Sequence, residues 1–206
     1  MTTHKSILSC ITVLLIVFMP SSLVWAQTPG KIVVQTIDEG LAILNDPALK
    51  SPDKMPERRQ KLWDTVKGVF SFEETAKRAL GRHWNDRTPQ EQQEFTETFQ
   101  NILKNIYLEK SDSYAQENIT YISEMVEGDR SKVYTYFTTS DSKQIDVIFS
   151  MKIFGSDWRI YDVTVEGVSI VGNYRSQFNS ILSKSTFAEL MDKLREKESE
   201  IIKLEK

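Results

Sequence analysis

The residues whose chemistry could support catalysis are few. The only histidine after residue 26 is His83, and the only cysteine of the chain is Cys10. A Cys–His pair or a histidine-rich metal site therefore cannot be built from residues 27–206. Ser169 lies in the sequence Gly-Val-Ser-Ile-Val, which lacks the second glycine that a G-x-S-x-G nucleophile elbow requires.

The other candidate groups have structural explanations. His83 follows a predicted helix end, where a histidine more often caps carbonyl groups or packs than catalyses. Glu73 and Glu74 fall in the first turn of a predicted helix, where the helix dipole favours carboxylates. A formal net charge of −3 without a basic stripe argues against nucleic-acid binding. We expect that the protein is not an enzyme and that it binds no metal and no cofactor. A catalytic site would have to be formed by carboxylates that only the fold brings together.

The first 26 residues have the pattern of a cleaved signal peptide. Lys5 precedes an apolar run over residues 7–19, and Val24-Trp25-Ala26 fits a small-x-small cleavage site. The run is too short for an ordinary membrane span, although a retained anchor is the competing interpretation. We therefore expect an exported protein with a single domain over residues 27–206.

Helical periodicity dominates the first part of that domain. We expect helices over residues 27–45, 57–69 and 71–81, and a longer one from Thr88 that carries an apolar stripe to Tyr107. Further helices are expected over residues 173–182 and from Thr186, with residues 192–206 a charged tail that frays or extends as a solvated helix. Three of these helices begin with capping boxes, namely Ser71–Glu74, Thr88–Glu91 and Thr186–Glu189.

From Asn118 the apolar period changes from helical to two. Strands are predicted over residues 119–126, 131–139, 143–154 and 158–165, and the turns between them are short. Short turns make neighbouring strands antiparallel. The predicted fold class is α+β, with a four-stranded antiparallel meander whose one face is covered by several helices.

The stretch 158–182 passes from strand to elbow to helix. Its strand places Tyr161, Val163 and Val165 on one face, and Trp158 and Ile160 on the other. An apolar elbow lies between two glycines. The order of these parts predicts that the following helix folds back over the sheet.

Three segments together resemble one family. They are FSFEETAKRALGRHW at 70–84, TPQEQQEF at 88–95, and WRIYDVTVEGVSIVGNYRSQFNSIL at 158–182. The combination W-R-x-Y-D-V, E-G-V-S and N-Y-R-x-Q-F at fixed spacing is similar to the MlaC family. These proteins are the periplasmic phospholipid-binding components of the Mla lipid-transport system, also called toluene-tolerance proteins.

The resemblance implies a soluble, monomeric shuttle that carries phospholipid between the outer and inner membranes and maintains outer-membrane lipid asymmetry. It implies an apolar cavity that holds the acyl tails while the headgroup faces solvent. The implied partners are an inner-membrane ABC transporter with a substrate-binding ring and an outer-membrane lipoprotein–porin complex. Without the resemblance, the alternatives are a periplasmic adaptor that uses its apolar face to bind a protein, or a hydrolase on a similar cup-shaped fold.

The candidate lipid-binding residues are inward apolar side chains of the helix from Thr88, the strands and the elbow. They are Leu103, Tyr107, Val133, Phe137, Val147, Phe149, Met151, Tyr161, Val163, Val165, Val168 and Ile170. Each could instead fill an ordinary core, but short valines on the sheet would leave room for a ligand. Arg175 could contact a headgroup phosphate or pair with Asp162 or Glu166.

Overall fold

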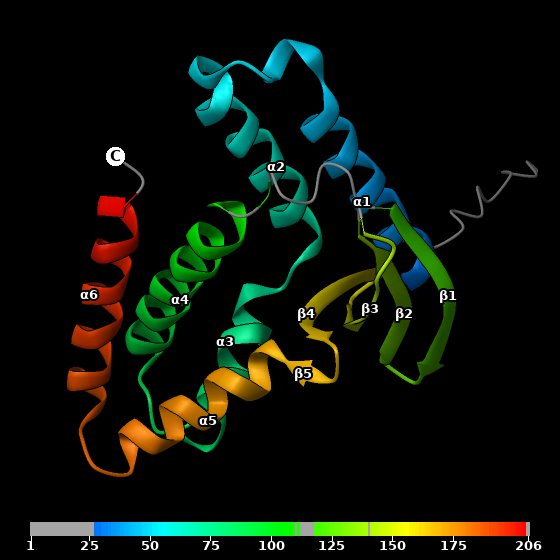
Figure 1. Ribbon diagram of the computed structural model, residues 1–206. Coiled ribbons are helices and arrows are strands. Elements are labelled where there is room, and N and C mark those ends of the chain that lie inside the picture. The colour runs from blue at the N-terminus through cyan, green and yellow to red at the C-terminus, as the bar shows by residue number, and fades with distance from the viewer. Residues whose placement is uncertain (1–26, 110, 112–117, 140, 205–206) are drawn as a thin grey trace, which may run out of the picture.

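The computed structural model describes residues 27–109, 111, 118–139 and 141–204 (Figure 1). The predicted signal peptide and Ser140 of one predicted turn lie outside these residues. The helices are α1 (Pro29–Asn45), α2 (Met55–Val69), α3 (Phe72–Leu80), α4 (Pro89–Glu109), α5 (Ile170–Leu182) and α6 (Phe187–Leu204). The strands are β1 (Asn118–Glu127), β2 (Arg130–Thr138), β3 (Gln144–Phe154), β4 (Asp157–Val165) and β5 (Val168–Ser169).

The sheet has the strand order β1-β2-β3-β4-β5, and every neighbouring pair is antiparallel. The α+β class and the four predicted strands are confirmed. The fifth strand was not predicted, because its two residues lie in the stretch assigned to an elbow. Glu166 and Gly167 both have positive φ, at 47° and 80°, and this tight turn brings Val168 back beside Val165.

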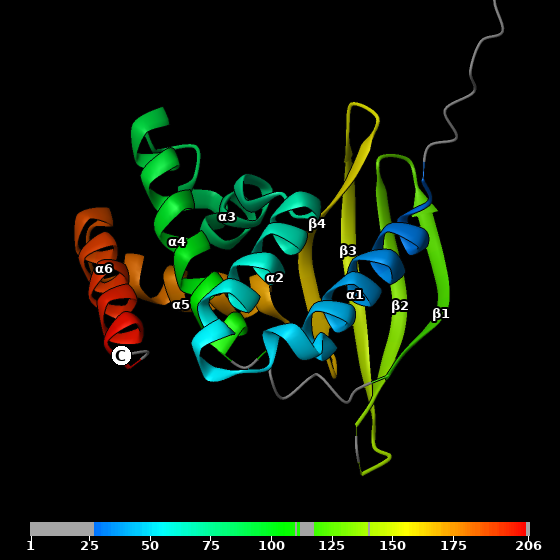
Figure 2. The same ribbon diagram turned by 90° about the horizontal axis from the view of Figure 1, so that it is seen from above.

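Helix α1, rather than the helix after the elbow, covers the sheet. Figure 2 shows α1 lying across one face of the sheet, and Val33 of α1 is buried with Val133 and Met151 of the strands. The prediction that the helix after β4 folds back over the sheet was therefore wrong. That helix, α5, runs away from the sheet toward α6 (Figure 1).

Helix α5 instead belongs to a separate helical core, together with α3, α4 and α6. Phe178 of α5 packs against Phe95 and Phe99 of α4, with ring centroids 5.5 Å apart in both pairs. Aromatic residues bury large apolar areas, so this cluster fixes α5 against α4.

Helix α6 continues to Leu204, and its charged sequence hides an apolar stripe. Leu194 and Ile201 are buried in the helical core, and Asn101 of α4 donates a hydrogen bond to Glu198 over 2.9 Å. The described part of the predicted tail is thus helical, but one of its faces packs against α4.

Two predicted capping boxes are complete. The N–H groups of Thr88 and Thr186 donate to the carboxylates of Glu91 and Glu189 over 2.8 and 2.7 Å, and the threonine hydroxyls accept in return. This contact lowers the pKa of both carboxyl groups below their ordinary range.

The third box, at Ser71, is only half formed. Its hydroxyl accepts from the N–H of Glu74, but the Glu74 carboxylate pairs with Arg78 at 2.7 Å. The N–H of Ser71 donates to Ile160 in β4 over 2.8 Å. The sheet thus replaces the glutamate as the acceptor, and the start of α3 is tied to β4.

Candidate functional site

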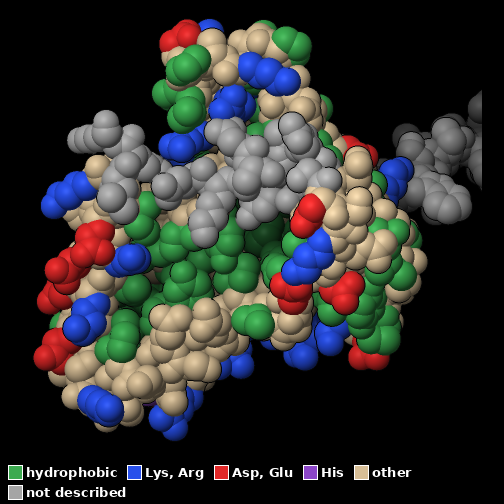
Figure 3. All heavy atoms as spheres, in the orientation of Figure 1, with side chains coloured by type: hydrophobic (Ala, Val, Ile, Leu, Met, Phe, Trp, Pro, Cys, Tyr) green, Lys and Arg blue, Asp and Glu red, His purple; other side chains and the backbone are tan. Residues whose placement is uncertain are grey.

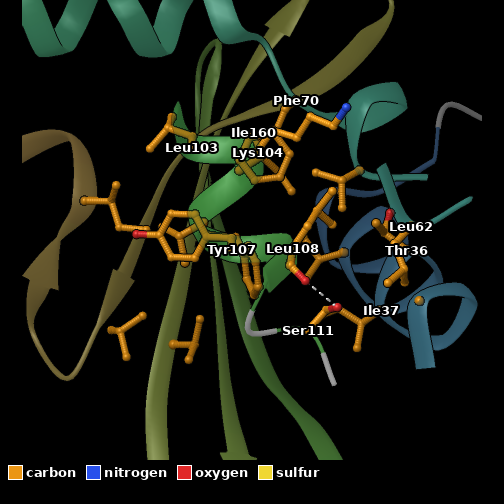
Figure 4. Close-up of a pocket in the computed structure, with 18 of the residues that line it drawn as sticks. Thr36, Ile37, Leu62, Phe70, Leu103, Lys104, Tyr107, Leu108, Ser111 and Ile160 are labelled. Carbon is orange, nitrogen blue, oxygen red and sulfur yellow. Dashed lines mark hydrogen bonds between the residues drawn. The ribbon is translucent and has the colours of Figure 1, made fainter. Parts of the chain in front are cut away.

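A cavity of about 490 Å³ lies between the sheet and the helices. Its wall is formed by side chains of α1, α2, α4 and strands β2 to β4, with smaller contributions from the start of α3 and α5. Figure 3 shows hydrophobic side chains gathered in a hollow at the centre of one face. Figure 4 shows the wall residues of α1, α4 and β4 around the cavity.

The cavity exists because the molecule has two hydrophobic cores instead of one. The first core lies between α1 and the sheet, and the second is formed by the four helices α3, α4, α5 and α6. The two are connected where α3 meets β4, since the Thr75 hydroxyl lies 2.9 Å from the carbonyl oxygen of Tyr161. Beyond this junction α4 stays apart from the sheet, and the space between them remains open.

A bulge in β4 shapes the wall at that junction. Ser150 of β3 pairs with Asp162, whereas the next residue, Met151, pairs with Ile160. Tyr161 is therefore the extra residue of a β-bulge, which bends the strand and shifts its side-chain alternation. As a result both Ile160 and Tyr161 reach the cavity.

Most of the predicted lipid-binding residues line this cavity. They are Leu103, Tyr107, Phe137, Val147, Phe149, Tyr161, Val163, Val165 and Ile170. Among the lining residues, Tyr107 and Val165 are the two that are exposed, at 42% and 37%, so the opening lies beside them.

Three predicted residues lie elsewhere. Val133 and Met151 are fully buried, at 0% exposure, in the core between α1 and the sheet. Val168 is 62% exposed and pairs with Val165 next to the opening. It therefore extends the apolar rim without forming part of the described wall.

Arg175 has a structural role at the end of α3. Its Nε donates a hydrogen bond to the carbonyl oxygen of Arg78 over 2.6 Å, which satisfies a carbonyl in the last turn of that helix. Neither predicted ion pair forms. Asp162 accepts from the Ser169 hydroxyl and the Val171 N–H, and Glu166 pairs with Lys143 at 3.1 Å.

The wall also contains residues that were not predicted. Ile160 was assigned to the opposite face of β4, and no residue type signals the bulge that turns it inward. Helix α1 contributes Ile37, Leu41 and Leu44, which share one side of the predicted 27–45 helix. That apolar stripe was a signal that could have identified α1 as a wall element.

Polar wall residues are sparse and most are satisfied by the chain. The hydroxyls of Thr36, Thr75 and Ser111 all donate to main-chain carbonyl groups. Within the described residues, no three histidine, cysteine or acidic side chains come together as a metal site. His83 lies outside the wall, and its Nε2 is 3.2 Å from Oδ1 of Asn179 in α5. The arrangement is suited to hold an apolar ligand.

Comparisons with known proteins agree with this geometry. A solved structure with a TM-score of 0.75 is the phospholipid-binding protein from Ralstonia solanacearum in complex with a phospholipid. It is 20% identical in sequence, and the match covers 85% of this chain and 99% of the other. No curated protein matches the chain significantly. The sequence model of the MlaC protein family matches residues 34–196, and the chain belongs to the MlaC family.

Proposed function

We propose that this protein is a phospholipid-binding shuttle whose cavity holds acyl tails. The observation that carries this proposal is the apolar cavity of about 490 Å³, which opens beside Tyr107 and Val165. Its volume falls within the range of about 300–1,000 Å³ that is typical of sites for small molecules. The similar structure from Ralstonia solanacearum, which holds a phospholipid, supports the same ligand class.

The physical need for such a cavity follows from the cost of exposing acyl chains to water. Each methylene that leaves an apolar environment costs about 0.8 kcal/mol, so ten methylenes cost roughly 8 kcal/mol. A lipid with two chains therefore crosses water very slowly unless a carrier provides comparable apolar surroundings. Binding alone meets this need, and the wall accordingly requires no nucleophile, acid or base.

The proposed place of action is the periplasm of a Gram-negative envelope. The signal-peptide pattern of residues 1–26 and membership of the MlaC family support this location. Within the described residues, no helix has the length and apolarity to cross a membrane. The protein would act as a monomer. It would receive or deliver lipid at two partners, an outer-membrane lipoprotein–porin complex and an inner-membrane ABC transporter with a substrate-binding ring. This exchange would maintain the lipid asymmetry of the outer membrane.

A transfer assay tests the shuttle directly. Donor vesicles with labelled phospholipid are separated from acceptor vesicles by a membrane that passes protein but not vesicles. Delipidated protein should move label to the acceptor at a rate that rises with protein concentration. Transfer no faster than in the absence of protein would contradict the proposal.

A protein-binding adaptor is the second candidate, and it is favoured by the edge strand β1. Its apolar residues Tyr121, Ile122, Met125 and Val126 are between 43% and 54% exposed, and an exposed apolar edge is often covered by a partner. An adaptor would contain no lipid in an organic extract of the purified protein. Phospholipid in that extract would exclude the adaptor as the sole function.

A further inference from the structure

Lys104 of α4 is the one lysine or arginine among the described residues that line the cavity. Figure 4 draws it among apolar wall residues, including Leu103 and Ile160. Its side chain is partly buried. Its ammonium lies 5.3 Å from the centre of the Trp63 ring, a cation–π contact across the gap between α4 and α2.

This ammonium has no described carboxylate within ion-pairing distance. The one acidic residue of the wall, Asp162, is already occupied, because it accepts from the Ser169 hydroxyl over 2.6 Å and from the Val171 N–H over 3.0 Å. Those bonds hold the Asp162 carboxylate at the start of α5. A cation beside apolar surface is unfavourable unless an anion or water satisfies it.

The threonine and serine hydroxyl groups of the wall donate within the chain, and the remaining hydroxyls, those of Tyr107 and Tyr161, are neutral donors. Thr36 donates its hydroxyl hydrogen to Ile32, and Ser111 donates to Leu108. The hydroxyl of Thr75 lies 2.9 Å from the carbonyl oxygens of Ser71 and Tyr161. Lys104, with three N–H donors, is therefore the strongest donor that the wall offers to an anionic oxygen.

We propose that Lys104 binds the anionic oxygen group of an amphiphile whose acyl tail fills the cavity. The group is a phosphate diester or a carboxylate, so a phospholipid and a free fatty acid share the required chemistry. This inference rests on the proposed lipid-binding function and adds to it a preference for ligands with a negative group. The apolar surroundings strengthen the ion pair, because they lower the local dielectric constant.

Two substitutions of Lys104 and one matched control separate charge from packing. Lys104→Met removes the charge and keeps an unbranched apolar side chain, whereas Lys104→Arg keeps the charge. Lys31→Met makes the first change on α1, another wall helix, at a residue that is exposed and outside the wall. Circular dichroism and chemical denaturation of all four proteins check that each is folded.

Each delipidated protein is then offered two pairs of probes, and in each pair one member carries an anionic group and the other is neutral. The first pair is dioleoylphosphatidylglycerol vesicles with a small fraction of dioleoylglycerol. The second pair is oleate and oleyl alcohol at equal concentrations. Bound lipids are extracted after the protein is separated, and the ratio of anionic to neutral ligand is measured.

We expect Lys104→Met to lower this ratio about tenfold relative to the original protein, the effect of one lost charge-assisted hydrogen bond. Lys104→Arg and Lys31→Met should stay within about threefold of the original ratio. A loss confined to the phosphatidylglycerol pair identifies phosphate as the bound group, and a loss confined to the oleate pair identifies a carboxylate.

Two results would overturn the inference while the proposed function stands. One is a Lys104→Met variant that binds the same amounts of anionic and neutral ligand as the original protein in both pairs. The other is an equal loss of both ligands, which leaves the ratio unchanged and would make Lys104 a packing residue. If the original protein binds none of the four probes, the lipid-binding function itself fails and the inference fails with it.

Discussion

The hydroxyl of Thr75 in α3 lies 2.9 Å from the main-chain carbonyl oxygen of Tyr161 in β4. Thr75 is buried, and Tyr161 is the extra residue of the bulge. This contact joins the helical core to the sheet. Both Thr75 and Tyr161 also line the cavity.

Replacing Thr75 with valine should weaken the junction. The change keeps the shape of the side chain but removes the donor, so the free energy of unfolding should fall by about 1–2 kcal/mol. Urea denaturation measures this change. Thr96→Val is the matched control, because the Thr96 hydroxyl donates only to Gln92 within α4, and its effect should stay below about 0.5 kcal/mol. Equal effects of the two changes would show that the Thr75 contact does not hold the junction.

Filling the cavity should reduce lipid binding. Val147 of β3 lines the cavity, whereas the next residue, Ile148, lies on the opposite face of the sheet. Val147→Trp should leave less than about half of the bound phospholipid per protein, since the indole occupies volume that an acyl chain would use. Ile148→Trp should retain normal lipid content. Phosphorus analysis of folded, purified variants provides the measurement, and normal content in Val147→Trp would place the acyl tails elsewhere.

The end of α6 offers a matched pair of neighbouring isoleucines. Ile201 is 6% exposed and packs in the helical core, whereas Ile202 is 40% exposed. Ile201→Ala should lower the free energy of unfolding by about 2–4 kcal/mol, because it leaves a cavity beside α4, and Ile202→Ala by less than about 1 kcal/mol. Thermal or urea denaturation compares the two. Similar small effects would mean that this part of α6 is a solvated tail.

Tyr174 should make the protein less stable in alkali. Burial beside Phe99 and Phe178 raises the pKa of the Tyr174 hydroxyl above its ordinary value. The folded state holds this proton more tightly than the unfolded state. The contribution of Tyr174 to the free energy of unfolding is therefore fully present below about pH 10 and decreases as the pH rises further. Tyr174→Phe should lack this part of the decline. Urea denaturation between about pH 9 and 11 tests it, and parallel curves for the two proteins would contradict the prediction.

The local elements could be predicted from the sequence because each has a local cause. Thr88 and Thr186 begin their helices with complete capping boxes, and the alternation of Val147 and Phe149 marks a strand with one buried face. These patterns depend on residues within a few positions of one another. They therefore indicate the structure before any tertiary contact is known.

The arrangement of these elements depended on contacts between distant residues. The apolar side of the 27–45 helix did not reveal that α1 would cover the sheet. The aromatic partners of Phe178 lie on α4, far away in the sequence. At the bulge, the carbonyl groups of Ile160 and Tyr161 accept hydrogen bonds from the N–H of Ser71, the N-cap of α3, and from the hydroxyl of Thr75 in α3. No short pattern in β4 carries that information.

The cavity lies between two separate hydrophobic cores, one on the sheet and one among the helices. Val133 and Met151 are apolar and follow the same alternation as the wall residues of β2 and β3, yet they are fully buried in the core between α1 and the sheet. Sequence alone cannot distinguish a residue that faces a cavity from one that faces a helix, because both are apolar and inward. Lys104 was also overlooked, because a lysine within an apolar stripe of a helix is usually a solvated side chain.

Native mass spectrometry of the protein purified from a Gram-negative host tests lipid binding most directly. We predict a mass above that of the polypeptide by one or more phospholipids, which collisional activation releases and an organic extract identifies. Only the mass of the polypeptide, together with no phospholipid in the extract, would contradict the account.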